Sequence, residues 1–173
     1  MYYAKMRRYD VANGPGIRAT LFVSGCKHNC PGCFNQEAQS FRYGQAWSQQ
    51  DEETFVELAK DPYIQGITIL GGEPMDQIQD DHLLNLLSRL RQETTQPIWI
   101  YSGYTYEEIL ENHKRSDLLR QCDVLVDGKF LLAEKDLRLH YRGSRNQRII
   151  DVPKSLASNQ VIEIHFNSKG ETV

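Results

Sequence analysis

Short apolar runs that end in glycine alternate with amphipathic stretches along this chain, and this alternation constrains the fold most. The predicted strands are residues 18–25, 66–72, 97–103 and 122–129, with an alternating run at 159–166 as a final strand. The predicted helices, with apolar residues spaced for one face, are 51–60, 79–92 and 105–120. Strands and helices in this order predict an α/β fold with a parallel sheet and crossover helices.

The carboxyl ends of the four glycine-ended strands carry residues suited to chemistry. They read SGC, LGGEP, YSGY and VDGK, so each contains glycine, and three contain a polar or charged side chain. Parallel α/β folds bring these ends to one side of the sheet, where ligands bind. We therefore expect the four segments to share one site.

The size and charge of the chain exclude several classes of function. Its 173 residues suit one domain, and a net charge of -3 gives no basic face for nucleic acid. No run approaches the roughly 20 apolar residues that span a bilayer, and the start, MYYAKMRRYD, lacks the apolar segment of a signal peptide. We therefore expect a cytoplasmic protein, without membrane or nucleic-acid partners, whose cysteines stay reduced.

Three cysteines cluster in the segment SGCKHNCPGCFN. Thiolates bind zinc or iron–sulfur clusters, and the spacing of Cys26, Cys30 and Cys33 lets one loop wrap three corners of a cluster. The alternative is structural zinc with His28 as fourth ligand, although zinc sites usually draw ligand pairs from two separate places. With an iron–sulfur cluster, His28 is expected on the loop surface. Cys122 lies away from the functional strand ends and is expected in the core.

The cysteine spacing and a second motif resemble those of the radical S-adenosylmethionine (SAM) enzymes. Cys26-x3-Cys30-x2-Cys33, followed by Phe34, matches their CxxxCxxC motif, and GGEP at 71–74 matches the other. The resemblance implies that the cysteines hold three irons of a [4Fe-4S] cluster, that the fourth iron is open for SAM, and that Phe34 lies by the adenine. The residues implied to contact the SAM amino group are Gly71, Gly72, Glu73 and Pro74.

Two further strand ends resemble the glycyl radical enzyme activases within this family. Ser102 in YSGY matches a position along the SAM site, although it is equally explained as a strand-end hydroxyl. Asp127 and Lys129 match a D-x-K motif and, two apart on an extended chain, are expected to point the same way. The resemblance implies that Lys129 approaches SAM, and that Asp127 helps to bind a monovalent cation or shapes the SAM site. A solvated turn is the alternative.

Two more segments resemble one branch of the activases. NGPGIR resembles a (D/N)GPGxR stretch where the partner's glycine loop docks, and YRGSRNQRIID at 141–151 resembles a tail segment of the branch that acts on anaerobic ribonucleotide reductase. The residues expected to contact the partner are Asn13, Gly14, Pro15, Gly16, Arg18 and Arg142. The resemblance spans about residues 9–151 of a single domain, 1–173, and leaves 152–173 as an extension of unknown role.

The resemblance implies an oxidoreductase that acts on another protein. An electron from the cluster would cleave SAM, and the resulting radical would take a hydrogen from a glycine in the large subunit of anaerobic ribonucleoside-triphosphate reductase, leaving a glycyl radical. A flavodoxin-type protein is the expected electron donor. Because a full eight-stranded barrel needs about 250 residues, we expect a partial (β/α) barrel of about six mostly parallel strands, open on one side. The alternatives are a small radical SAM enzyme acting on a small molecule or peptide, and a zinc-stabilised binding module.

Overall fold

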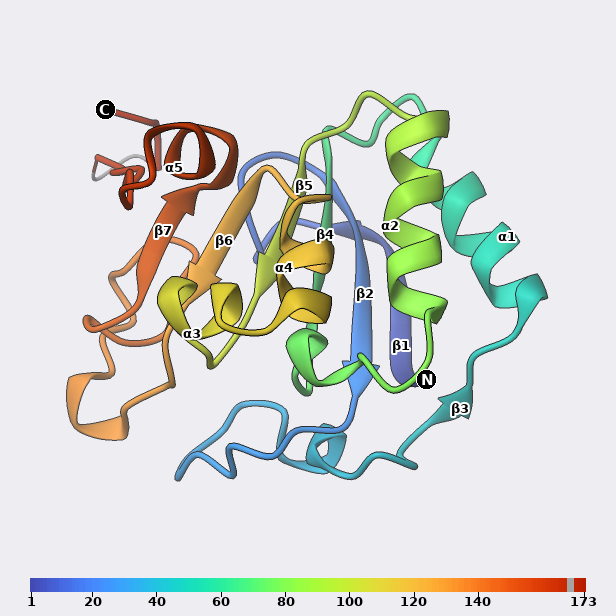
Figure 1. The fold of residues 1–173 in the computed structure, drawn as a ribbon, viewed down its shortest axis with the longest axis horizontal. Coiled ribbons are helices and arrows are strands. Elements are labelled where there is room, and N and C mark those ends of the chain that lie inside the picture. Colours follow the sequence, from blue (N-terminus) through green and yellow to red (C-terminus); the bar gives the residue numbers. More distant parts are fainter. Residues whose placement is uncertain (168–169) are drawn as a thin grey trace.

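A single seven-stranded sheet organises the chain in this computed structural model, which describes all residues except 168–169 (Figure 1). The strands are β1 (Tyr2–Asp10), β2 (Arg18–Ser24), β3 (Gln45–Ala46), β4 (Gly66–Gly71), β5 (Ile98–Tyr101), β6 (Val124–Asp127) and β7 (Arg148–Asp151). Their order across the sheet is β3-β1-β2-β4-β5-β6-β7. The four glycine-ended strands predicted from the sequence are confirmed as β2, β4, β5 and β6, which lie next to one another.

The centre of the sheet is parallel and its edges are antiparallel. β2 pairs in parallel with β4, β4 with β5, and β5 with β6. β1 runs antiparallel to both β2 and β3, and β7 runs antiparallel to β6. The sheet is open, as expected. It has seven strands where about six were predicted, and it is mostly parallel, as predicted, with antiparallel pairing at its two edges.

The helices connect the central strands as the crossover pattern requires. They are α1 (Gln49–Ala59), α2 (His82–Glu93), α3 (Tyr106–Leu110), α4 (His113–Leu119) and α5 (Val152–Ser158), with 3-10 turns η1 (Gln36–Gln39), η2 (Pro74–Asp76) and η3 (Leu132–Glu134). A capping box formed by Thr105 and Glu108 begins α3. The helix predicted over 105–120 is two helices, because Asn112 is extended and its side chain caps α4.

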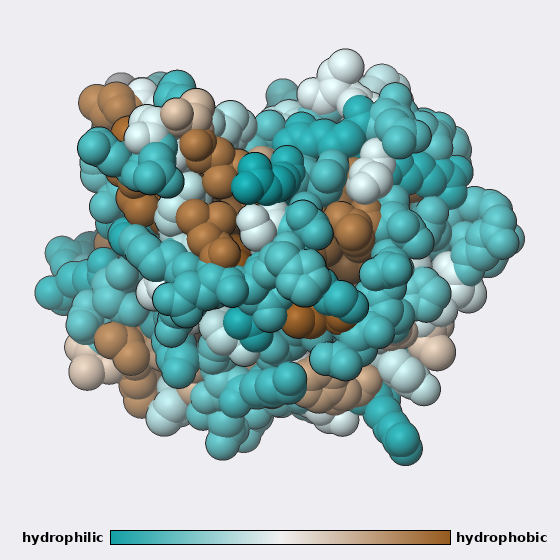
Figure 2. Space-filling model, in the orientation of Figure 1, coloured by the Kyte–Doolittle hydropathy of each residue, from teal (hydrophilic) through white to brown (hydrophobic). Residues whose placement is uncertain are grey.

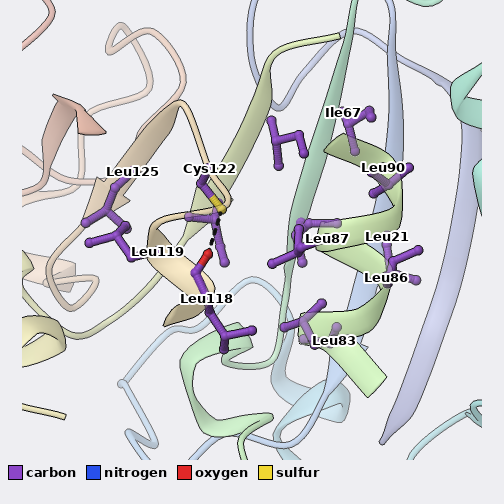
Figure 3. Close-up of a cluster of buried hydrophobic side chains, with 14 of the residues drawn as sticks. Leu21, Ile67, Leu83, Leu86, Leu87, Leu90, Leu118, Leu119, Cys122 and Leu125 are labelled. Carbon is purple, nitrogen blue, oxygen red and sulfur yellow. Dashed lines mark hydrogen bonds between the residues drawn. The ribbon is translucent and has the colours of Figure 1, made fainter. Parts of the chain in front are cut away.

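The helices cover one face of the sheet and bury the main core. α1 packs on β2 and α2, and α2 packs on α4. In Figure 1, α4 lies in front of β4 and β5, and α2 lies to its right on the same side of the sheet. The leucines of α2 that Figure 3 labels are fully buried, as expected for one apolar helix face. Cys122 lies in the same core, with its Sγ 3.4 Å from the carbonyl oxygen of Leu118 (Figure 3). Its predicted role as a core residue is confirmed.

Near β6 and β7 the C-terminal segment covers the opposite face of the sheet. Trp99, Val126 and Ile149 form a second, smaller core there, and Phe166 packs against it. The run at 159–166, predicted as a strand, is irregular: it follows β7 through one isolated bridge, Ile150 to Glu163, and two backbone hydrogen bonds of 2.7 and 2.9 Å. The extension beyond residue 151 therefore begins as α5 and then returns along the edge of the sheet.

The outer surface over the helices is mainly hydrophilic, with hydrophobic residues in small separate areas (Figure 2). No helix among the described residues is long and apolar enough to cross a membrane. On the opposite face of the sheet, which these helices leave uncovered, the molecule has a concave groove.

Candidate functional site

A groove of about 790 Å³ runs along the uncovered face of the central strands. Phe22, Leu70 and Tyr101 line it from β2, β4 and β5. At one end lie the cysteine loop and the segment after β6, beyond the carboxyl ends of the parallel strands (Figure 1), and Asn13 lines the groove from the opposite end of β2. Its volume lies within the roughly 300–1,000 Å³ typical of small-molecule sites.

The groove brings together most, but not all, of the residues predicted from the sequence. The predicted residues that line it are Asn13, Cys26, Cys30, Cys33, Phe34, Gly71, Gly72, Glu73, Ser102 and Arg142. The predicted residues that lie outside this lining, all of them described by the structure, are Gly14, Pro15, Gly16, Arg18, Pro74, Asp127 and Lys129. The carboxyl ends of β2, β4 and β5 therefore share one site, as the sequence predicts.

All three cysteines of the loop are free and partly exposed on the groove. Burial raises the pKa of the Cys26 thiol to about 11, and burial together with neighbouring Cys33 raises the pKa of Cys30. The backbone N–H of His28 donates to Cys26 Sγ and that of Asn35 donates to Cys33 Sγ, each at 3.4 Å. Such N–H···S contacts orient thiolate ligands of a metal and tune it.

The three thiols match the donor set of an iron–sulfur cluster. Soft thiolates are the ligands that such clusters take, and all three come from one loop and line one groove. Among the described residues, no group of three or more His, Cys, Asp or Glu side chains is arranged to hold a single metal ion.

Gly71 and Gly72, at the end of β4, let the backbone pack closely against the start of the cysteine loop. Gly71 has φ +116°, and a Cβ there would lie 2.5 Å from the carbonyl oxygen of Val23. A Cβ on Gly72 would lie 2.6 Å from the carbonyl oxygen of Gly25, just before the first ligand. Only glycine allows this approach, so the GGEP turn and the cysteine loop are packed as one unit.

The carboxylate of Glu73 is buried (1% exposed) and bonded within the protein. Its Oε1 accepts hydrogen bonds from Ser102 Oγ (2.8 Å) and Met75 N (2.9 Å), and its Oε2 accepts one from Gly103 N (2.7 Å). Glu73 and Ser102, predicted separately from two motifs, thus form one hydrogen-bonded unit between β4 and β5. The neighbouring backbone of Gly71 and Gly72 is left to face the groove.

His28 does not lie on the loop surface, where the sequence had placed it. Its side chain is only 7% exposed, and its ring meets that of Tyr104 edge-on, with 4.3 Å between the centroids. The sequence signal for its burial is the pair Gly103-Tyr104 in YSGY, because a glycine beside an aromatic residue leaves space in which a second ring can pack.

Phe34 is exposed at the mouth of the groove, at 62%. Its ring lies 5.1 Å from that of Phe130, and the Lys135 ammonium lies 5.1 Å from its centroid. Phe130, which the sequence did not single out, thus extends the aromatic wall predicted at Phe34. A flat ligand such as a nucleobase can stack on a wall of this kind.

Asp127 and Lys129 do not share a side of the chain, contrary to the expectation from their spacing. Gly128 between them has φ +94°, so the strand has already ended. Asp127 is buried: its carboxylate accepts from Arg148 Nε (3.0 Å) and from Tyr106 N (2.7 Å), while Lys129 is exposed. In this structure Asp127 joins the end of β6 to β7 and to the start of α3.

Replacing Asp127 by asparagine is expected to lower the free energy of unfolding by about 2–3 kcal/mol, because Arg148 loses its buried partner. Urea unfolding followed by circular dichroism measures this. The control is Glu107→Gln, which removes the exposed partner of the same guanidinium and is expected to cost no more than about 0.5 kcal/mol. Equal effects of the two substitutions would contradict the assignment.

Arg18, predicted to contact a partner, is instead buried (1% exposed) beneath the NGPGIR turn. It donates to Thr68 Oγ1 (2.6 Å) and to the carbonyl oxygens of Pro15 (3.0 Å) and Ile67 (2.8 Å). Burial lowers its pKa to about 10. From the sequence, a charged residue is expected to be exposed. Here the carbonyl acceptors that permit its burial come from the preceding turn, at Pro15, and from β4, at Ile67.

The RGSRNQR segment forms a wall of the groove. Arg142 donates to the carbonyl oxygen of Gln147, and Gln147 Oε1 accepts from the backbone of Gly143 (2.8 Å) and Ser144 (3.1 Å). Gln147 also donates to the carbonyl oxygen of Gly128 (3.0 Å). The segment is therefore a closed turn tied to the end of β6, with Arg142 on the groove.

Comparisons with known proteins agree with this geometry. Residues 12–150 match the family model described as a 4Fe-4S single cluster domain. The chain is 41% identical over 152 residues to the anaerobic ribonucleoside-triphosphate reductase-activating protein of Vibrio cholerae, covering 86% of this chain and 97% of that one. It is 39% identical to the protein of that name from Escherichia coli strain K12 (85% and 96% covered) and 36% identical to that of Enterobacteria phage T4 (86% and 93%).

The cysteines and the glycine turn fall within the matched residues, as do all the residues that line the groove except Lys5 and Arg7. Sequence identity at this level over most of both chains shows that they share a fold and belong to one family. The chain therefore belongs to the family of anaerobic ribonucleoside-triphosphate reductase-activating proteins and contains that family's 4Fe-4S cluster domain.

Proposed function

We propose that the protein activates the large subunit of an anaerobic ribonucleoside-triphosphate reductase by installing a glycyl radical. The observation that carries the proposal is the convergence on one groove of three free thiols, the glycine turn after β4 and the Ser102 end of β5. A [4Fe-4S] cluster held by Cys26, Cys30 and Cys33 would supply the electron for reductive cleavage of SAM to methionine and a 5'-deoxyadenosyl radical, and that radical would take the hydrogen from a backbone glycine of the reductase.

The chain's own residues bind and orient the reactants. Cys26, Cys30 and Cys33 hold the cluster, and the close-packed backbone of Gly71 and Gly72 offers carbonyl oxygens to the amino group of SAM. The aromatic wall that begins at Phe34 takes the adenine. Since Glu73 already accepts three hydrogen bonds, its role is to hold the turn in place. Positioning of this kind is the protein's main contribution when a cofactor carries the chemistry.

The remaining length of the groove accommodates the glycine loop of the reductase. Asn13 lines one end of the groove and Arg142 one wall, so both are placed to contact an extended peptide. The turn that carries Asn13 is shaped by residues that do not line the groove themselves: Gly14, Pro15, Gly16 and Arg18. We further propose that the open sheet is the partial barrel of the radical SAM type, with the missing side as the entrance.

The electron donor must approach the cluster from outside. Cys30 and Cys33 are partly exposed, so a flavodoxin-type protein in the cytoplasm can approach the loop that carries them. Lys129 is exposed next to Cys30 and favours an anionic neighbour there, such as the carboxylate of SAM. A monovalent cation near Asp127 would compete with Arg148 for the same carboxylate oxygens.

The test is anaerobic electron paramagnetic resonance of the reconstituted, reduced protein, with and without SAM. We expect a reduced [4Fe-4S] signal that changes when SAM is added, followed by a glycyl radical doublet when the reductase is supplied. A signal that SAM changes, without radical formation on the reductase, would favour the alternative of a small-molecule or peptide substrate. A cluster indifferent to SAM would refute the mechanism.

A further inference from the structure

His28 occupies a shaped seat between the ends of β4 and β5. Its Nε2 lies 3.1 Å from Glu73 Oε2, and its ring packs on Tyr104. Gly103 forms the floor of the seat: a Cβ there would lie 2.5 Å from His28 Cδ2. The backbone of Gly103 also donates to the same Oε2 of Glu73, so the histidine and the glycine meet at one carboxylate oxygen.

The walls of this seat are themselves fixed. Tyr104 donates its hydroxyl to Asp76 Oδ1 (2.9 Å), and the guanidinium of Arg115 lies over its ring at 3.7 Å from the centroid. Asp76 also accepts from the backbone of Lys27 (3.1 Å), the residue next to His28. The seat is thus built from two strand ends and holds a side chain that arrives from a third.

His28 lies between Cys26 and Cys30 in the chain, so the contacts that hold His28 also position these two cysteines. Upstream, the loop is attached through backbone contacts: Glu73 N donates to the carbonyl oxygen of Gly25 (2.8 Å), and Cys26 N donates to that of Gln39 (3.0 Å). Between Cys26 and Cys30, the contact with Glu73 is made by the His28 side chain. Its Nε2 is fully buried at ion-pair distance, yet not aligned for a hydrogen bond, so packing in the seat, more than one bond, fixes the ring.

We propose that His28 is a positioning residue that fastens the cysteine loop to the Glu73–Gly103 unit, setting Cys26 and Cys30 relative to the glycine turn. The inference rests on the proposed function only where it calls that turn the SAM site. It assigns a role to a residue beyond the three cysteines and links the cluster ligands directly to the ends of β4 and β5.

The test uses the reconstituted protein and measures the rate at which a chelator removes its iron under anaerobic conditions. His28→Asn is expected to speed iron release about tenfold, in line with the loss of an outer contact to metal ligands. His28→Gln, whose longer side chain fills more of the space left by the ring and brings an amide nitrogen near the position of Nε2, is expected to restore part of the slow release. Gly103→Ala keeps the histidine but fills the space in which its ring packs. We expect this substitution to speed iron release as much as His28→Asn does.

The double variant separates this role from general destabilisation. If both substitutions act through one contact, His28→Asn with Gly103→Ala releases iron no faster than either alone. Multiplied effects, or wild-type release from His28→Asn, would overturn the proposal. In the same samples, we expect His28→Asn to need more SAM for the half-maximal change in the reduced-cluster spectrum. If SAM left the wild-type spectrum unchanged, the proposed function would fail, while the iron-release rates would still decide the role of His28.

Discussion

Replacing any one of Cys26, Cys30 and Cys33 by alanine is expected to remove the cluster and abolish SAM cleavage. Each thiol is free and lines the groove, and the described residues of that lining include no other cysteine that could take its place. Iron and sulfide content after anaerobic reconstitution, together with production of 5'-deoxyadenosine, measures the effect. We expect iron below about one-tenth of the wild-type content, since a cluster held by two thiolates is readily lost.

Cys122→Ala is the matched control for these three substitutions. Cys122 is 1% exposed within the main core and contacts Leu118 on α4. Its removal leaves a small cavity that costs about 1 kcal/mol of stability and is expected to spare both iron content and SAM cleavage. Loss of the cluster from Cys122→Ala alone would show that the ligand assignment is wrong.

Replacing Arg18 by methionine is expected to be the most destabilising single change away from the cysteine loop. The guanidinium donates to Thr68, Pro15, Ile67 and Pro97, and methionine would leave these buried acceptors without their donor. We expect the free energy of unfolding to fall by about 4 kcal/mol. With a slope typical of a small domain, the urea midpoint then falls by about 2 M.

The control for Arg18→Met is Arg138→Met, which changes an exposed arginine on the segment after β6. We expect its free energy of unfolding to stay within about 0.5 kcal/mol of the wild-type value. A similarly small effect of Arg18→Met would contradict its role beneath the NGPGIR turn, and would return Arg18 to the set of residues available to a partner.

The central strands were predictable because each is an apolar run bounded by glycine, and their order along the chain dictates parallel pairing. The edge strands were not. β1 carries four charged residues, Lys5, Arg7, Arg8 and Asp10, and β7 has only two apolar ones, Ile149 and Ile150. Their pairing depends on strands elsewhere in the sheet, so the local sequence pattern does not predict that these segments form strands. The break at Asn112 was likewise hidden, because the apolar spacing continues across it.

The site was predictable where chemistry requires a particular residue type. Thiols are needed for a cluster, and glycines for the close approach at Gly71 and Gly72. It was not predictable where burial decides the role. Asp127, Arg18 and His28 have side chains that a sequence assigns to the surface. Distant segments supply hydrogen-bond partners for Asp127 and Arg18, and they supply the residues against which the His28 ring packs.

An open sheet has two free edges, and each is a potential site of adhesion between copies of the chain. Here one edge ends in β3, which is two residues long, and the other is occupied by the C-terminal segment that follows β7. Because β3 pairs only with Tyr2 and Tyr3, most of β1 has no strand on its outer side. Lys5, Arg7 and Arg8 place positive charge on that strand, and charged side chains on an edge strand disfavour pairing with another chain. We therefore expect charge to limit self-association at one edge of the sheet and the C-terminal segment to limit it at the other.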